Sequence, residues 1–294
     1  MADPAPGTWF VVPAFGRPEA TGRALRSLFD DGARNVLLVD DEGRGHGEEM
    51  AAAFPDARVA RTEAPVFWTG AIRLGVEHAL REGATGVVFF NQDVTVERGF
   101  LARLEEAARR TPGAVIGCAV VYGHEREMVW SAGARMEWIG RGFRVLFHGR
   151  PVTELPAAPF LVDWTHGMGT YVPAEVFGRI GLPDAERFPM AWGDADFGLR
   201  ARKAGVAVLV DPGLRLVHEV GDYDPRVAGA PGLREYLSWL GSDRHYLSLS
   251  AHAEFWRRHA PRGLRPLSYL LRVGFLLVNY VRIRTLFGRR PPSP

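Results

Sequence analysis

The first 121 residues alternate between short apolar runs and longer stretches in which apolar positions recur with a helical period. Apolar runs rich in β-branched residues predict buried strands at Thr8–Val12, Asn35–Asp40, Gly86–Phe90 and Ala114–Val121. The helical period predicts helices over Pro18–Asp30, Ala71–Glu82 and Gly99–Thr111. Nearly continuous apolar strands separated by helices are typical of a mostly parallel sheet that is covered on both faces.

The pattern is less regular after residue 121. Short polar and aromatic segments over residues 122–170 predict a smaller, antiparallel extension of the sheet. A helix is expected over Asp194–Ala204, and strand segments at Ala207–Val210 and Leu214–Val217 lead to His218. The chain is therefore expected to adopt an α/β fold with a Rossmann-like sheet flanked by helices, a mixed extension and C-terminal helices.

Composition narrows the class of protein. The 294 residues are 47% hydrophobic, which is enough for one large α/β domain or two small ones. The single cysteine, Cys118, excludes an intramolecular disulfide and favours a reducing, cytoplasmic setting. Because Cys118 lies in an apolar run, we expect it in the core and not as a nucleophile.

The charge distribution sets the C-terminal part of the chain apart. Nine arginines and no acidic residue follow Glu254, although the whole chain has a net charge of only +2. An acidic body with a basic tail argues against binding of nucleic acid and favours a tail that contacts something anionic.

A helix over Leu264–Leu286 would place a polar stripe along this tail, consisting of Arg265, Ser268, Arg272, Asn279 and Arg282. Leucines and valines cover much of the remaining surface. The longest stretch without arginine, Val273–Val281, is too short to span a bilayer. Residues 264–290 are therefore predicted to lie on an anionic membrane surface, with packing on the body or on a partner subunit as the alternative.

Polar residues follow three consecutive predicted strands, at Pro13–Arg17, Asp40–Asp41 and Asn91–Asp93. In an open α/β sheet, ligands bind beyond the carboxyl ends of the strands. An aromatic ring there could stack on a base, a carboxylate could bind a base N–H or a ribose hydroxyl, and a second carboxylate could hold a metal on a diphosphate. The alternative for Asp40 and Asp41 is a purely structural role as helix caps or turn residues.

Other nucleotide-binding and hydrolytic motifs are absent from the sequence. Gly43, Gly45 and Gly47 follow the second strand without the dinucleotide-binding spacing, so a flexible loop is expected there. The chain contains no Walker A sequence, no G-x-S-x-G elbow and no cysteine pair for zinc.

The ordered combination of motifs between Trp9 and Gly221 resembles family 2 glycosyltransferases of the GT-A fold, especially the rhamnosyl- and galactofuranosyltransferase branch. The motifs begin with the segments that follow the first two strands, Pro13–Pro18 and Asp40–Asp41. They continue with Phe67–Gly75, Phe90–Asp93, Asp163–Gly167 and Trp192–Arg200. The resemblance implies an inverting transfer of a sugar from a nucleoside-diphosphate sugar to an acceptor hydroxyl.

The resemblance also implies roles for the donor site. Nucleotide contacts fall on Pro13, Phe15, Arg17 and on Asp40 or Asp41, and contacts to the diphosphate and sugar fall on Gly70 and Arg73. Asn91-Gln92-Asp93 stands where the family has Asp-x-Asp. Asp93 and His218 match ligands of a divalent metal, Mn²⁺ or Mg²⁺, and the histidine makes Mn²⁺ at least as suitable.

Asp194 matches the catalytic base, and the expected acceptor contacts are Trp164, His166, Trp192 and Asp196. The alternatives are that both tryptophans lie in the core, that His166 has a structural role, and that the aspartates only cap the helix. The sequence departs from the family at two positions. Asn91 replaces the first acid of Asp-x-Asp, and Gly193 replaces an acidic neighbour of the base.

A catalytic domain over residues 1–222 is expected, with a nucleotide-binding half near 8–121 and an acceptor half near 122–222, followed by a basic helical tail over 223–294. Glycans, lipid-linked glycans and small molecules are all candidate acceptors. The alternatives are a nucleotide-sugar-binding protein without turnover and, last, a nucleotidyltransferase. The latter would need a Gly-rich basic loop after the first strand, where this chain has Pro13-Ala14-Phe15.

Overall fold

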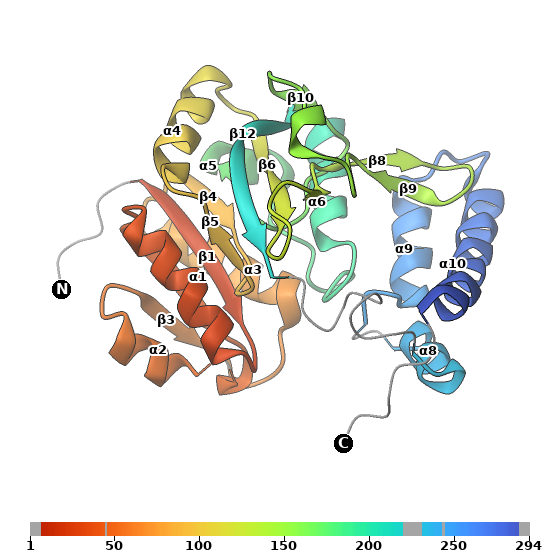
Figure 1. Cartoon of the computed structure of the whole chain (residues 1–294), viewed down its shortest axis with the longest axis horizontal. Helices are drawn as coiled ribbons and strands as arrows, with labels where there is room; N and C mark the ends of the chain where they lie inside the picture. The colour runs from red at the N-terminus through yellow and green to blue at the C-terminus, as the bar shows by residue number, and fades with distance from the viewer. Residues whose placement is uncertain (1–6, 45, 220–230, 243–244, 288–294) are drawn as a thin grey trace.

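A computed structural model describes residues 7–44, 46–219, 231–242 and 245–287 of the chain (Figure 1). The predicted boundary between residues 222 and 223 lies outside the described residues, as do Arg289 and Arg290. Within the described ranges, the fold is a curled, mostly parallel sheet with helices on both faces, which confirms the predicted fold class.

The main sheet has ten strands, eight of them in the order β10-β12-β6-β11-β4-β1-β2-β3. Strands β3, β2, β1 and β4 are parallel, and β11 is inserted antiparallel between β4 and β6. The short strands β5 and β7 pair with β12 and β6. The bounds are β1 Thr8–Ala14, β2 Asn35–Asp40, β3 Arg58–Arg61, β4 Gly86–Phe89, β5 Val94–Val96, β6 Val115–Tyr122, β7 Val129–Ser131, β10 Phe160–Leu161, β11 Thr170–Pro173 and β12 Val208–His218.

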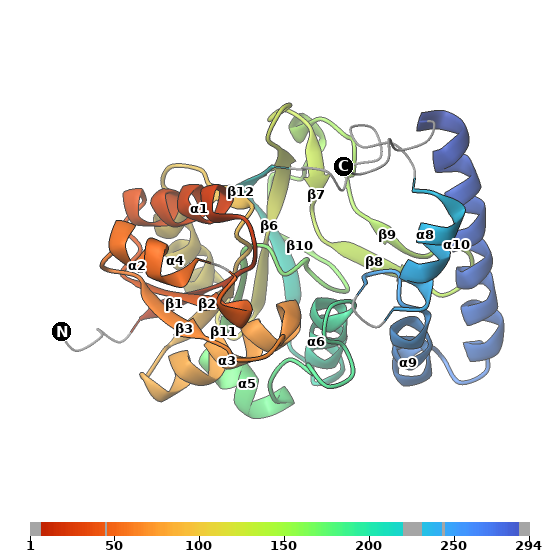
Figure 2. The ribbon, with the colours of Figure 1, turned by 90° about the horizontal axis from the view of Figure 1, so that it is seen from below.

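A hydrophobic core lies on each face of this sheet, and helices cover both faces (Figure 2). One core contains buried residues of α1 (Pro18–Asp30) and α4 (Phe100–Arg110), and the other contains those of α3 (Phe67–Arg81), α5 (Ala174–Ile180) and α6 (Gly193–Lys203). All residues of β2 and β6 are buried, as their continuous apolar runs predict.

Several elements differ from the sequence-based expectation. Residues Asp41–Gly43 form a 3₁₀ helix and α2 (Gly47–Ala53) begins at the third glycine, so helical segments flank the expected loop, in which Arg44 and His46 are not helical. Gly45 lies outside the described residues. The edge strand β3, the three-residue β5 and helix α5 were not predicted, because their sequences are short or polar. The two predicted C-terminal strand segments form one strand, β12, with an irregularity between Asp211 and Arg215.

The predicted antiparallel extension is present. It comprises β7, β10 and a separate hairpin of β8 (Ala134–Glu137) and β9 (Gly142–Val145), and a 3₁₀ helix covers Val152–Glu154. Helices α9 (Leu249–His259) and α10 (Arg265–Phe287) lie beside this hairpin and α6, with α8 (Leu233–Leu240) next to α10 (Figures 1 and 2).

Helix α10 matches the predicted tail helix in extent, but its polar stripe does not lie on one surface. Ser268 and Arg272 face inward and are buried, whereas Arg282 is exposed. Across the described ranges, no helix is both long enough and apolar enough to span a bilayer.

Candidate active site

The segments that follow β1 and β4 are joined through Gln92. Its side-chain oxygen accepts a hydrogen bond from the Phe15 backbone N–H at 2.9 Å, and its amide nitrogen donates to the Phe15 carbonyl at 3.0 Å. The Thr21 hydroxyl of α1 also donates to this oxygen. The middle residue of Asn91-Gln92-Asp93 therefore fixes the loop that carries Phe15, a role that the sequence motif did not reveal.

Phe15 and Arg17 both border this edge of the sheet. The Phe15 ring is exposed, and the Arg44 guanidinium lies 5.7 Å from its centroid. Arg17 Nη1 lies 3.3 Å from Asp93 Oδ2. Pro13 is partly buried near the end of β1. An exposed aromatic ring with one guanidinium group beside it, and a second guanidinium group beside Asp93, are suited to a base and a diphosphate.

Asp40 and Asp41 are both buried, and their carboxylates bind backbone N–H groups of the following helices. Asp40 Oδ2 accepts from Gly47, at the start of α2. Asp41 accepts from the N–H groups of Val66 and Phe67, at the start of α3. Both carboxylates thus have the structural role given above as the alternative, and contact with the nucleotide stays a prediction.

Asp93 and His218 lie together at the ends of β4 and β12. His218 Nε2 is 3.7 Å from Asp93 Oδ2, the oxygen that also contacts Arg17. The other oxygen, Oδ1, is buried and has no hydrogen-bond partner among the described residues. One carboxylate oxygen and one imidazole nitrogen are suitable ligands for Mn²⁺. No group of three or more metal-ligating side chains occurs in the described ranges, so a diphosphate or water would have to complete the shell.

The Trp130 ring of β7 lies beside both histidines of the site. Its centroid is 4.9 Å from that of His218 and 5.3 Å from that of His166. His166 Nδ1 contacts the Ser131 hydroxyl at 2.8 Å, and burial, with help from the charges of His148 and His218, lowers the pKa of His166 to about 4. The sequence did not indicate Trp130, because this residue lies in a three-residue strand outside all of the motif segments.

A chain of contacts connects the strand edge to Asp194. Trp68 Nε1 donates to Asn91 Oδ1 at 2.7 Å. The Trp68 ring packs so closely on Gly167 that a Cβ there would lie 2.0 Å from it. The Gly167 N–H in turn donates to Asp194 Oδ2 at 3.2 Å. Three of the motif segments and the head of α6 therefore meet at one place.

Asp194 is partly buried in the first turn of α6. Its Oδ1 also accepts from the Ala195 N–H at 2.7 Å. Burial raises the pKa of Asp194 to about 6, and the hydrogen bonds from Ala195 and Gly167 oppose this rise only in part. The carboxyl group titrates near neutral pH, as a general base requires.

The two tryptophans predicted at the acceptor site differ in exposure. Trp164 has an exposed fraction of 3% and packs on Phe143, which leaves little ring surface for a sugar. Trp192 is partly buried, adopts a positive φ of 69° directly before α6, and stacks on Phe255 of α9 at 4.3 Å. Trp192 therefore connects the head of α6 to the C-terminal helices.

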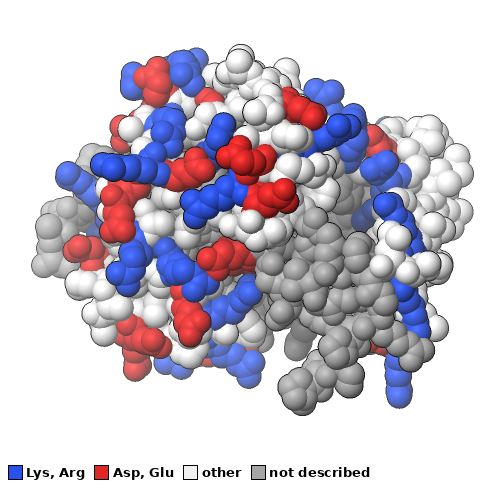
Figure 3. Space-filling view, viewed as in Figure 1, with Lys and Arg blue, Asp and Glu red and all other residues white. Residues whose placement is uncertain are grey.

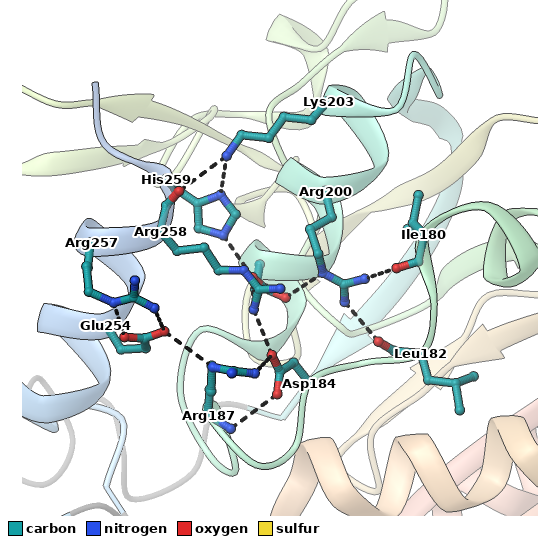
Figure 4. Close-up of polar contacts among 11 residues, drawn as sticks. Ile180, Leu182, Asp184, Arg187, Arg200, Lys203, Glu254, Arg257, Arg258 and His259 are labelled. Atoms are coloured by element: carbon teal, nitrogen blue, oxygen red, sulfur yellow. Dashed lines mark hydrogen bonds and ion pairs between the residues drawn. The ribbon is translucent and has the colours of Figure 1, made fainter. Parts of the chain in front are cut away.

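Asp196 also contacts residues of α9, and Figure 4 shows its partners Arg200, Arg258 and His259. Its exposed fraction is 0%, and its oxygens contact Arg200 Nε at 2.8 Å, His259 Nε2 at 2.8 Å and Arg258 Nη1 at 3.2 Å. Burial opposes its ionisation, but these partners outweigh burial and hold the pKa of Asp196 below its usual value. In this position Asp196 ties α6 to α9, and its predicted contact with an acceptor stays a prediction.

The two remaining predicted donor contacts lie on α3. Gly70 is buried in its first turn, and a Cβ there would lie 2.9 Å from Val66 Cβ. Arg73 is partly exposed and pairs with Glu77 at 3.1 Å. The contacts of Gly70 and Arg73 with the donor stay predictions.

Residues 9–166 match the family described as Glycosyl transferase family 2. The chain belongs to this family. The predicted family and enzyme class are therefore confirmed.

Curated relatives and a solved structure extend this comparison. A dTDP-rhamnosyl transferase, RfbF of Shigella flexneri, is 26% identical over 156 residues, which are 53% of this chain and 50% of that protein. An uncharacterised protein of Mycobacterium tuberculosis is 26% identical over 209 residues, or 70% of this chain and 71% of the relative. The crystal structure of GalNAc-T7 with UDP, GalNAc and Mn²⁺ has a TM-score of 0.59 at 14% identity and covers 98% of this chain and 59% of that one. This likeness confirms the predicted GT-A fold.

Gly193 stands where the family has an acidic residue, and the structure gives a steric reason for this difference. A Cβ at Gly193 would lie 2.3 Å from the Thr69 hydroxyl oxygen and 2.8 Å from Thr69 Cγ2. Thr69 itself is fully buried, and its backbone N–H donates to the Pro189 carbonyl at 3.0 Å. Thr69 therefore occupies the space that an acidic side chain at position 193 would need.

We expect Gly193→Ala to lower the free energy of unfolding by about 1–3 kcal/mol, through overpacking against Thr69. Alanine has a higher helix propensity than glycine, so a loss of stability in this variant can be attributed to the clash with Thr69. Thermal denaturation measures the effect. The double variant with Thr69→Ala should recover most of the stability, since Thr69 Oγ1 has no hydrogen-bond partner among the described residues. A single variant as stable as the parent would show that Thr69 moves aside.

Proposed function

We propose that this chain is an inverting glycosyltransferase that moves a sugar from a nucleoside-diphosphate sugar to an acceptor hydroxyl. The proposal is carried by the position of Asp194, a carboxyl group with a pKa of about 6 at the edge of the sheet that also holds Asn91 and Asp93. Family membership supports the same reaction class.

The donor is proposed to lie along the segments after β1 and β4. Phe15 would stack on the base, and Arg17 would bind the diphosphate beside Asp93. The relative from Shigella flexneri is named for dTDP-rhamnose, and the GalNAc-T7 structure contains UDP, which supports a nucleoside diphosphate as the shared group. We keep Pro13, Asp40, Asp41, Gly70 and Arg73 as proposed donor contacts.

Asp194 would accept the proton of the acceptor hydroxyl as the oxygen attacks C1 of the sugar. The bond between C1 and the diphosphate oxygen breaks on the opposite face, and the nucleoside diphosphate leaves. The configuration at C1 is inverted, because the reaction is a single displacement. Asp194 then releases its proton to water.

A divalent cation is proposed to be held by Asp93 and His218, with Mn²⁺ favoured by the imidazole. Such an ion would neutralise the negative charge that develops on the leaving diphosphate. The fit rests on the unpartnered Asp93 Oδ1 and on the nearby His218 imidazole. Mn²⁺ in the GalNAc-T7 structure supports a divalent ion in this fold.

The acceptor is proposed to enter beside Trp130 and His166. The Trp130 ring contacts both His166 and His218, and His218 is one of the two proposed metal ligands. The chemical class of the acceptor, whether glycan, lipid-linked glycan or small molecule, stays a prediction, as does the cytoplasmic setting. Because the His166 imidazole is neutral at pH 7, it can donate or accept a hydrogen bond with an acceptor hydroxyl.

Two measurements test the proposal. Thermal shift against a panel of nucleotide sugars with Mn²⁺ should identify a stabilising donor. Incubation of that donor with candidate acceptors should then release nucleoside diphosphate, and NMR should show the inverted anomeric configuration in the product. Binding without release under any of these conditions would indicate a nucleotide-sugar-binding protein, and a retained configuration would contradict the single displacement.

The raised pKa of Asp194 predicts the acidic limb of the pH profile. Below its pKa of about 6 the carboxyl group is protonated and cannot accept the acceptor proton. We therefore expect kcat/KM to fall about ten-fold per pH unit below about pH 6 and to level off above it. Initial rates between about pH 4.5 and 8, with thermal stability measured at each pH, check this expectation. A flat profile over this range would contradict the role of Asp194.

A further inference from the structure

Helix α10 buries Ser268 and Arg272 against the protein and exposes most of its leucines and valines. Its inner face contains the buried side chains of Ser268, Arg272, Leu276 and Tyr280. Arg272 has an exposed fraction of 6%, donates to the Arg141 carbonyl at 2.8 Å and lies over the Phe143 ring at 5.0 Å. These contacts fix the rotation of the helix on the body.

The outer face of α10 is an apolar stripe, made of Leu267, Leu270, Leu271, Leu277, Val278 and Val281. These residues follow the three- and four-residue spacing of one helix face. The exposed fractions of Leu270 and Val278 are 66% and 67%. A continuous exposed stripe of this kind marks an interaction surface, unlike scattered single leucines.

Arginines flank the stripe on both sides. At about 100° per residue, Arg282 and Arg284 lie about 80° to either side of the centre of the stripe. Arg262 is exposed directly before the helix, and α10 contains no acidic residue. In Figure 3 the face over α10 at the right of the molecule is free of charged side chains and is bordered by a column of basic ones. The surface is thus apolar at its centre and positive at its margins.

We propose that the outer face of α10 lies in the surface of a membrane that contains anionic lipids. Leucine and valine side chains would enter the region between headgroups and acyl chains, and the flanking arginines would contact lipid phosphates. A contact between two copies fits less well, because a two-fold axis along the stripe would bring arginines against arginines. This inference is independent of the proposed transfer reaction, since it concerns a different face.

Vesicle flotation tests the proposal with the full chain. The protein should float with phosphatidylcholine vesicles that contain about a third phosphatidylglycerol and much less with phosphatidylcholine alone. The double variant Leu270→Glu/Val278→Glu should lower the partition coefficient by at least about ten-fold. Arg282→Gln should lower it roughly five-fold, and high salt should have a similar effect.

Leu161→Glu is the matched control, because Leu161 is equally exposed but lies on β10. It should float like the parent. Thermal denaturation and nucleotide-sugar binding should be unchanged in all variants, which separates a loss of membrane binding from a loss of the donor site. A parent chain that does not float would overturn the proposal. A double variant that floats like the parent would also overturn it. The same holds if the parent is a dimer and the double substitution makes it monomeric without changing its flotation.

Discussion

Replacement of Asp194 by asparagine is expected to lower turnover by about 10²-fold or more. Asparagine retains the shape of the side chain, and its one amide oxygen can still accept one of the two hydrogen bonds, from Gly167 or from Ala195. It cannot take up the acceptor proton. Steady-state kinetics should therefore show a large loss in kcat with nearly unchanged donor affinity and thermal stability, and the acidic limb of the pH profile should disappear with the carboxyl group.

Asp196→Asn provides the matched control, two residues further along α6. This carboxylate is buried among His259, Arg200 and Arg258, so its neutralisation should lower the melting temperature and affect turnover less. Nearly full activity in Asp194→Asn would leave Asp194 with only a structural role. His166 would then be the next candidate base, since Asp163 is already paired with Arg202 and with the Met136 N–H.

Replacement of Asp93 by alanine is expected to weaken nucleotide-sugar binding by roughly 10- to 100-fold in the presence of Mn²⁺. Asp93 supplies the only negative charge of the Asn91-Gln92-Asp93 segment, and its Oδ1 is the unpartnered oxygen of the site. Calorimetric titration of UDP-, dTDP- and GDP-sugars with and without Mn²⁺ measures the effect. The variant should bind with the same affinity in both conditions.

His218→Ala should produce a smaller loss, because Asp93 and the diphosphate remain as ligands. Gln92→Ala distinguishes a loss of metal from a displaced loop. It removes the hydrogen bonds to Phe15 while leaving Asp93 in place, so it should weaken donor binding without abolishing the Mn²⁺ dependence. If the parent binds equally well with and without metal, Asp93 and His218 do not hold an ion.

The regular half of the fold could be predicted because each element carries its own signal. The apolar run of β2 and the spacing of α1 give their bounds without error. β3 escaped prediction because it is a polar edge strand, and α2 because glycines precede it. The register of β3 with β2 depends on contacts between distant parts of the chain, so it cannot be predicted from the local sequence.

For the candidate site, the sequence indicated candidate residues but not the side chains that they contact. Asp194, Asp93 and His218 stand at strand or helix ends, where spacing alone marks them as candidates. The burial of Asp196 and the stacking of Trp192 on Phe255 involve α9, a helix that lies far from α6 in the chain. Such contacts between distant parts of the chain could not be predicted from the motif alone.

The dependence of α6 on α9 has a consequence for how the protein is made. During synthesis the sheet from β1 to β12 is complete by His218, and it can fold before the last quarter of the chain leaves the ribosome. The contacts of Trp192 with Phe255 and of Asp196 with His259 can form only after α9 has left the ribosome. In a nascent or truncated chain that ends before α9, Trp192 and Asp196 would lack these contacts, although Asp194 would keep its hydrogen bonds from Gly167 and Ala195. We therefore expect the proposed transfer to become efficient only after α9 has been synthesised.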